Sequence, residues 1–192
     1  MAILILGLAL FLGAHSTRIV ADEWRSAMVA RLGLNRWKGL YSLISLIGFV
    51  LVVWGYGRAR AEAVSLWSPP TWTAHAAALL TVPAFVLLAA TYVPRNQIQA
   101  AIHHPMVIGV QLWALAHLLA NGTLPAAVLF GAFLAWALLS FLAARRRDRV
   151  EGRVYAAGTP AMTLAAVAIG AGLWAGFAFW LHQRLIGVAP LG

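Results

Sequence analysis

Long apolar runs separated by short basic loops are the feature that most restricts how this chain can fold. A helix needs roughly 17 to 25 mostly apolar residues to cross a hydrocarbon core about 30 Å thick. We therefore predict an all-α integral membrane bundle of six transmembrane helices. The runs that meet the requirement lie at about residues 2–21, 40–57, 73–93, 105–121, 123–143 and 161–183.

The composition agrees with a chain that is mostly inside a bilayer. Of its 192 residues, 62% are hydrophobic and 10% are charged, which leaves no room for a separate soluble domain. We expect residues 1–192 to form a single transmembrane domain. The apolar runs are continuous rather than alternating, which argues against a β-barrel. The chain has no cysteine, so disulfides, thiolate metal ligands and iron–sulfur clusters are excluded.

Basic residues gather in the connections after the first, third and fifth predicted helices. These connections hold eleven of the fourteen lysines and arginines. Because positively charged loops stay in the cytoplasm, we expect both termini on the outer side of the membrane. The net charge of +9 is thus explained by basic loops that orient the helices in the membrane, and no nucleic acid partner is expected.

The connection after the first helix is predicted to form a short amphipathic helix on the membrane surface. Trp24, Met28 and Leu32 recur at roughly helical spacing, interleaved with Arg25 and Arg31. The basic side of such a helix would contact anionic lipids. Membrane lipids are therefore the first expected partners.

Two of the six histidines, His15 and His117, lie within predicted membrane helices. His15 is about six residues, or ~9 Å, from the basic end of its helix, and His117 about twelve residues, or ~18 Å. Ionisable side chains are costly in a bilayer and usually serve a function there. Two facing imidazoles would suit a bis-histidine haem. The alternative is that each one only hydrogen-bonds to a neighbouring helix.

The neighbours of both histidines suit a haem pocket. Asn121, one turn after His117, is a candidate acceptor for the second nitrogen of that imidazole. Trp113, one turn before His117, offers a flat pocket wall. Arg18 follows His15 by one turn and is a candidate partner for a haem propionate. Alternatively, Arg18 simply extends to the membrane interface.

Three segments together resemble a known family. They read LGLALFLGAHSTRIV, AIHHPMVIGVQLWALAHLLANG and HQRLIGVAP, and they span essentially the whole chain. The chain resembles the NnrU family of bacterial membrane proteins, which implies a location in the bacterial inner membrane. That family is associated with denitrification and with responses to nitric oxide. It also includes the zeta-carotene isomerase of plants and cyanobacteria, a haem b enzyme that isomerises a cis double bond.

The resemblance implies that His15 and His117 ligate the iron of haem b. It implies two uses for such a haem: isomerisation of an apolar polyene, or a redox or sensing role linked to nitric oxide or to a membrane quinol. Ala114 stands where the isomerase has a cysteine, so a thiolate cannot become an iron ligand here. His103 stands where relatives commonly have arginine. Both departures count against isomerase activity more than against haem binding, and no catalytic residue is identified.

The run His103-His104-Pro105 followed by Gly109 supports a second class of function. It is similar to the Arg-His-Pro…Gly motif of integral membrane methyltransferases, which bind S-adenosylmethionine at the cytoplasmic boundary and act on prenyl or phospholipid groups. Residues 147–155 resemble the glutamate-rich stretch of those enzymes only in part. If the chain binds haem instead, His104 is expected to contact a propionate or a lipid head group.

A third hypothesis is non-enzymatic: the bundle would assist or regulate another membrane complex. The basic residues 145–153 would then dock an acidic partner, although their role in orientation explains them equally well. Gly172 and Gly176 form a GxxxG pair in the last predicted helix. This spacing permits close helix contact and is compatible with a homodimer.

Overall fold

The computed structural model describes residues 1–191. Helices account for 82% of the chain, and no strand is present among the described residues. A π-helical turn, η1, interrupts the last long helix. The elements are α1 (Ala2–Val20), α2 (Asp22–Leu32), α3 (Leu34–Ala61), α4 (Trp72–Tyr92), α5 (Gln97–Ile102), α6 (Pro105–Ala120), α7 (Leu124–Glu151), α8 (Pro160–Gly176), η1 (Phe177–Leu181) and α9 (His182–Ile186).

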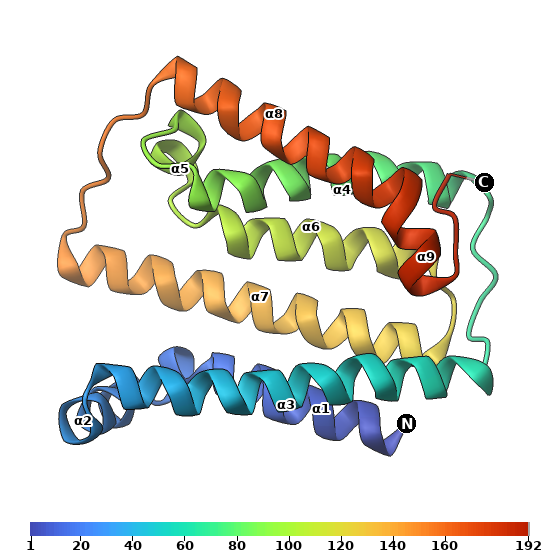
Figure 1. Ribbon diagram of the computed structural model, residues 1–192, viewed down its shortest axis with the longest axis horizontal. Helices are drawn as coiled ribbons and strands as arrows, with labels where there is room; N and C mark the ends of the chain where they lie inside the picture. Colours follow the sequence, from blue (N-terminus) through green and yellow to red (C-terminus); the bar gives the residue numbers. More distant parts are fainter. Residues whose placement is uncertain (192) are drawn as a thin grey trace.

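Five helical segments are long and apolar enough to cross a membrane, as in a multi-pass membrane protein. They are α1, α3, α4, α7 and the continuous stretch from Pro160 to Ile186. The sixth predicted span, α6, is apolar but has only 16 residues, a length of ~24 Å at 1.5 Å per residue. It packs between α4 and α7 (Figure 1). The count of six transmembrane helices therefore stays a prediction.

Two helices extend well beyond their predicted ends. The predicted span 40–57 lies within α3, and the predicted span 123–143 begins one residue before α7; each of these helices has 28 residues. Hydropathy locates only the apolar part of a helix, whereas backbone hydrogen bonding continues through charged turns such as the one at Arg145. As a result, α7 carries charged side chains well past its apolar part.

The predicted surface helix corresponds to α2, which is a separate element after α1. None of its residues is buried. Its charged and apolar side chains are not separated onto opposite sides, so the expected amphipathic pattern is weak. The placement of α2 on a membrane surface remains a prediction.

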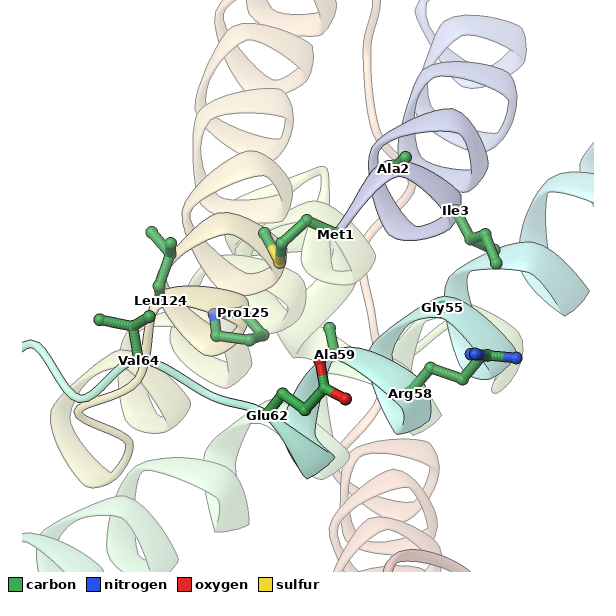
Figure 2. A pocket seen from close by; sticks show the side chains of 10 residues that line it. All are labelled: Met1, Ala2, Ile3, Gly55, Arg58, Ala59, Glu62, Val64, Leu124 and Pro125. Atoms are coloured by element: carbon green, nitrogen blue, oxygen red, sulfur yellow. The ribbon is translucent and has the colours of Figure 1, made fainter.

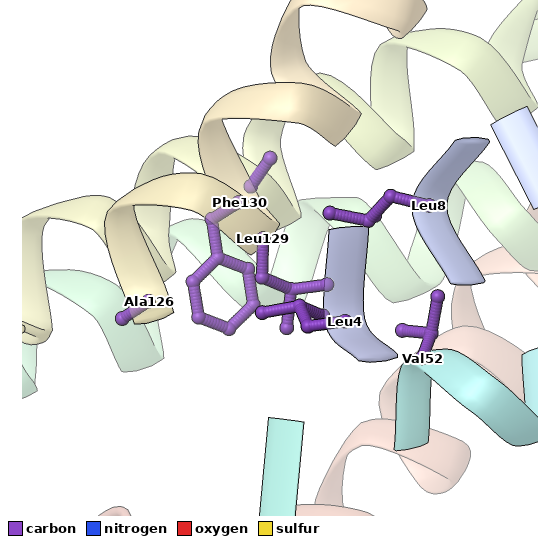
Figure 3. Close-up of a cluster of buried hydrophobic side chains, with 7 residues drawn as sticks. Leu4, Leu8, Val52, Ala126, Leu129 and Phe130 are labelled. Atoms are coloured by element: carbon purple, nitrogen blue, oxygen red, sulfur yellow. The ribbon is translucent and has the colours of Figure 1, made fainter. Parts of the chain in front are cut away.

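Glycines bring α1 and α3 into close contact. A methyl group at Gly7 would lie 2.5 Å from the backbone nitrogen of Val52, and one at Gly55 would lie 2.4 Å from that of Leu4. These helices therefore pack backbone to backbone, and α7 packs against both. Buried side chains of the three helices form a core (Figure 3) that also includes Ala114 of α6.

The second half of the bundle is formed by α4, α6 and α8. A methyl group at Gly170 of α8 would lie 2.5 Å from the Cα of Val86 in α4, so this glycine makes the close contact between the two helices. Nothing lies within 4 Å of the added methyl group at Gly172 or Gly176. The GxxxG pair thus makes no close contact within the chain, and the homodimer remains a prediction.

The two ends of the bundle differ in charge. α2, α5 and the connection between α7 and α8 lie at one end, and both chain termini lie at the other (Figure 1). The first of these is called the basic end below, because eleven of the fourteen lysines and arginines lie at or near it. The structure thus reproduces the predicted separation of charge between the two ends, while the side of the membrane that each end faces remains a prediction.

Candidate functional site

His15 is half-buried on α1, and a helical carbonyl fixes its imidazole. Its Nδ1 lies 2.7 Å from the carbonyl oxygen of Phe11, one turn earlier. Because a carbonyl can only accept, Nδ1 carries the proton and Nε2 keeps a free lone pair. The ring packs against Phe11 at a centroid distance of 4.3 Å, and Tyr41 and Trp136 lie farther out at 5.2 and 6.0 Å.

His117 repeats this arrangement on α6. Its Nδ1 donates to the carbonyl oxygen of Trp113 at 2.8 Å, so its Nε2 is also left with a lone pair. The imidazole stacks on Phe130 of α7 at 4.6 Å and lies 5.1 Å from the Trp113 ring. Both deep histidines therefore have the tautomer in which Nε2 can bind a metal.

Asn121 does not have the role expected from its spacing. Its amide Nδ2 donates to the backbone carbonyl of His117 at 2.9 Å, and no hydrogen bond joins it to the imidazole. Asn121 follows the last residue of α6, where carbonyl groups lack partners within the helix. The acceptor for the His117 imidazole is instead the Trp113 carbonyl, which lies one turn away on the same helix.

Aromatic rings lie between the two histidines. Phe11, Phe133, Trp113 and Phe130 form a continuous row with centroid distances of 5.8, 5.4 and 5.1 Å between successive rings. This set is called the aromatic row below. It fills the space between α1, α6 and α7 with side chains from all three helices.

The histidines contact α7 at different depths. His15 lies against Trp136, and His117 lies against Phe130, six positions earlier on the same helix. Six helical residues correspond to ~9 Å along the helix axis. The structure therefore brings both histidines to one helix and one aromatic row, but it does not place the two imidazoles in contact.

The donor chemistry of the two imidazoles fits a haem iron. Each imidazole offers Nε2, and the porphyrin supplies the remaining iron ligands. Residues 1–191 contain no group of three or more His, Cys, Asp or Glu side chains that could hold a metal ion without such help. Phe133 and Trp113 lie in the row of rings between the two histidines, so their side chains would have to move for one haem to be held by both.

In this structure the side chain of Arg18 pairs with Asp22. Its Nε lies 3.4 Å from Asp22 Oδ1, in a pair whose side chains are 51% and 40% exposed. Such an exposed pair contributes little stability. Arg18 can therefore exchange Asp22 for another anion at little cost, and its role as a propionate partner remains a prediction.

His104 belongs to a separate set of residues at the basic end. Its Nε2 lies 2.7 Å from Asp148 Oδ2, and the same oxygen accepts a hydrogen bond from Tyr155 at 3.0 Å. The ring of His103 stacks on Tyr155 at 4.0 Å and 3°, while Arg145 Nη1 donates to His103 Nδ1 at 3.2 Å. These five residues are called the basic-end cluster below.

Burial and the hydrogen bond to Asp148 raise the pKa of the Tyr155 phenol above its ordinary value. The phenol therefore remains protonated and donates to the carboxylate. The residues of this cluster lie in the two segments singled out in the sequence, but the pairing of His104 with Asp148 was not predicted. A single acid within the basic run RRRDR is a signal that could have suggested a paired carboxylate.

A cavity of about 460 Å³ lies at the opposite end, between the start of α1, the end of α3 and the start of α7 (Figure 2). Its charged side chains are Arg58 and Glu62. Neither deep histidine lines it, and it contains none of the predicted site residues.

Comparison with protein-family models gives one clear match, to the model described as NnrU protein, over residues 3–190. The chain belongs to the NnrU family. The match covers nearly the whole chain, which confirms the resemblance carried by the three sequence segments. No curated protein and no solved structure matches the chain.

Proposed function

We propose that this NnrU-family protein is a membrane haem b protein in which His15 and His117 would hold the iron. The observation that carries the proposal is the shared geometry of the two imidazoles. Each donates Nδ1–H to a carbonyl one turn earlier and so keeps Nε2 available. Family membership supports the same pair, because the resemblance to the haem-containing isomerase falls on these positions.

The other residues of the site have supporting roles. The two helical carbonyls fix the tautomer and the orientation of the imidazoles. After moving apart, the rings of the aromatic row would supply apolar walls that keep water from the haem. Ala114 is fully buried beside Trp113 and offers no thiolate. When bound, the haem would supply a redox couple and a Lewis-acid centre.

Two uses of the haem are proposed. One is a redox or sensing role linked to nitric oxide or a membrane quinol, which two imidazole ligands suit. The other is cis–trans isomerisation of a carotenoid-like polyene that enters from the bilayer. Expression in cells that accumulate a cis-carotenoid separates them: formation of the trans product supports the isomerase, and an unchanged cis pool supports the redox or sensing role.

Absorbance of the purified protein tests the ligand assignment. We expect a Soret band in the wild-type protein and a loss of haem affinity of at least roughly tenfold in His15→Ala and in His117→Ala. Added imidazole should restore part of the band, because it can occupy the space left by the side chain. His75→Ala is the matched control, since His75 is exposed on α4.

A Soret band of unchanged intensity and position in both alanine variants would contradict the assignment. A weaker band without rescue by imidazole would instead indicate a general loss of folding. Thermal unfolding of each variant distinguishes these cases.

A methyltransferase-like function is the second candidate, because one observation favours it. The two motif fragments meet in the basic-end cluster, where His104 and Asp148 are 44 residues apart in sequence. His104 bonds to Asp148, and His103 stacks on Tyr155. Calorimetric titration with S-adenosylmethionine tests this candidate: binding by a protein without a chromophore would rank it above the haem proposal.

A further inference from the structure

A second cavity, of about 410 Å³, lies at the basic end. Residues around α5 line one side of it, and residues 153–156 of the connection before α8 line the other. Arg95 and Arg153 are the two charged residues among the described residues that line it. Asp148, the carboxylate of the adjoining cluster, has Oδ2 engaged by His104 and Tyr155. The charge presented to the cavity is therefore positive.

The lining is also rich in hydrogen-bond donors. Arginine only donates, so the bond from Arg145 makes His103 Nδ1 an acceptor and leaves the proton on Nε2. The guanidinium of Arg95 has no hydrogen-bond or ion-pair partner among residues 1–191. Arg153 lies 3.9 Å from Asp148 and 5.9 Å from the Tyr155 ring centroid, with its side chain 57% exposed. Both guanidinium groups therefore retain donors for a ligand.

Positive φ angles at non-glycine residues occur, among residues 1–191, only in the lining of this cavity. Arg95 and His103, with φ values of 56° and 65°, are the only non-glycine residues with positive φ among residues 1–191. The His104 N–H donates to the carbonyl of Ile102 at 2.7 Å, which closes a strained γ-turn around His103. Both strained residues line the cavity. Strain of this kind typically persists where a function requires it.

The wall that carries Arg95 is held in place. Asn96 is 1% exposed, and its side chain bonds to the Ala90 carbonyl and the Gln99 amide, each at 2.8 Å. The Thr159 N–H donates to the Arg95 carbonyl at 2.8 Å. Gly158 lies so close that a methyl group there would be 2.2 Å from the Asn96 backbone. The cavity is therefore preformed, which reduces the cost of ordering it around a ligand.

We propose that this cavity binds a phosphate group, held by Arg95 and Arg153 with His103 Nε2–H as a further donor. Several phosphate oxygens can accept from separated guanidinium groups at once. The site lies at the end of the bundle, where either the phosphate of a lipid head group or a soluble phosphate ester can reach it. The proposal does not depend on haem binding by His15 and His117.

Binding of two probes tests the site and identifies the source of the phosphate. Inorganic phosphate is titrated against the protein in a neutral detergent. Phosphatidylglycerol retention is measured by native mass spectrometry after extraction from nanodiscs that contain phosphatidylglycerol and phosphatidylcholine. We expect Arg95→Gln and Arg153→Gln each to weaken binding of the preferred probe roughly tenfold. Arginine-dependent binding of inorganic phosphate indicates a soluble ester, and arginine-dependent retention of phosphatidylglycerol alone indicates a lipid.

Arg36→Gln is the matched control. Arg36 is exposed, lies at the same end of the bundle and carries the same charge, but it does not line the cavity. If Arg36→Gln weakened probe binding as much as the other two substitutions, general surface charge would explain the binding and the proposal would be overturned. Unchanged binding of both probes in Arg95→Gln and Arg153→Gln would overturn it as well, as would arginine-dependent binding of S-adenosylmethionine with no binding of either phosphate probe.

Discussion

The histidines in the middle of the bundle and those at its basic end are held in different ways. His15 and His117 each bond to a carbonyl of their own helix, so their tautomer is set by local geometry. His103 and His104 bond to arginine and aspartate side chains of α7. The first pair keeps Nε2 free within apolar surroundings, which suits a metal ligand. The second pair belongs to a charged network, which suits recognition of a polar ligand.

The middle of the bundle and its basic end also differ in how their side chains are packed. The aromatic row consists of rings that can turn about their side-chain bonds, so the middle of the bundle can rearrange around a macrocycle. The basic end has a wall fixed by Asn96 and a strained turn at His103. Haem binding in the middle of the bundle requires side chains to move, whereas the cavity at the basic end is already formed, so we expect substitutions in the two regions to have different effects.

The largest effect is expected from Gly55→Ala. The added methyl group would lie 2.4 Å from the backbone of Leu4, which cannot yield as a side chain can, so α1 must shift away from α3. We expect a loss of about 3 kcal/mol of stability and a clear decrease in Soret absorbance, because His15 moves with α1. Phosphate binding at the basic end should remain within about twofold of wild type, on the additivity of distant sites.

Gly57→Ala is the control for this change, since nothing lies within 4 Å of a methyl group at Gly57 on the same helix. Equal losses in the two variants, measured by thermal unfolding and absorbance, would show that the α1–α3 contact does not position the haem site.

A smaller effect is expected from Asp148→Asn. The substitution removes the charge and one of the oxygen acceptors while keeping the size of the side chain. We expect a loss of about 2 kcal/mol, because His104 and Tyr155 are left with a weaker, neutral partner. The Soret band should not change. The control is Glu151→Gln, which alters an exposed acid at the end of the same helix. A change in the Soret band of Asp148→Asn would place the cluster in the haem site.

The smallest effect is expected from Tyr155→Phe, which removes one hydrogen bond and preserves the stack on His103. A loss of about 1 kcal/mol is expected in chemical denaturation. The raised pKa of the phenol adds a pH dependence. Its contribution is fully present below the ordinary tyrosine pKa of 10.0 and is lost as the pH rises through the higher folded-state value. The stability difference between wild type and Tyr155→Phe should therefore shrink above pH 10; a constant difference across that range would contradict the raised pKa.

Much of the fold follows from local sequence. Apolar length predicts the helices, and loop charges predict which ends lie together, because both depend on residues that are close along the chain. The depth of His15 and His117 follows from the same count of residues. Hydropathy placed α6 to within one residue of its observed end, but it did not reveal the charged extensions of α3 and α7, since helical hydrogen bonding continues where apolar character ends.

The hydrogen-bond partners of the site residues were not predicted from the sequence. The sequence shows Asn121 near His117, but the imidazole bonds to the Trp113 carbonyl one turn earlier, and the Asn121 amide bonds to the His117 carbonyl. Likewise, nothing in the local sequence joins His104 to Asp148, since that contact depends on how α7 packs against α6.

The family, the helical membrane architecture, the basic end and the two deep histidines could be predicted from residues that lie close together along the chain. Two other features follow from how the helices pack: the histidines meet α7 six positions apart with an aromatic row between them, and a cationic cavity forms at the basic end. Apolar length and charge act locally. The register between packed helices depends instead on the fit of side chains distant in the chain.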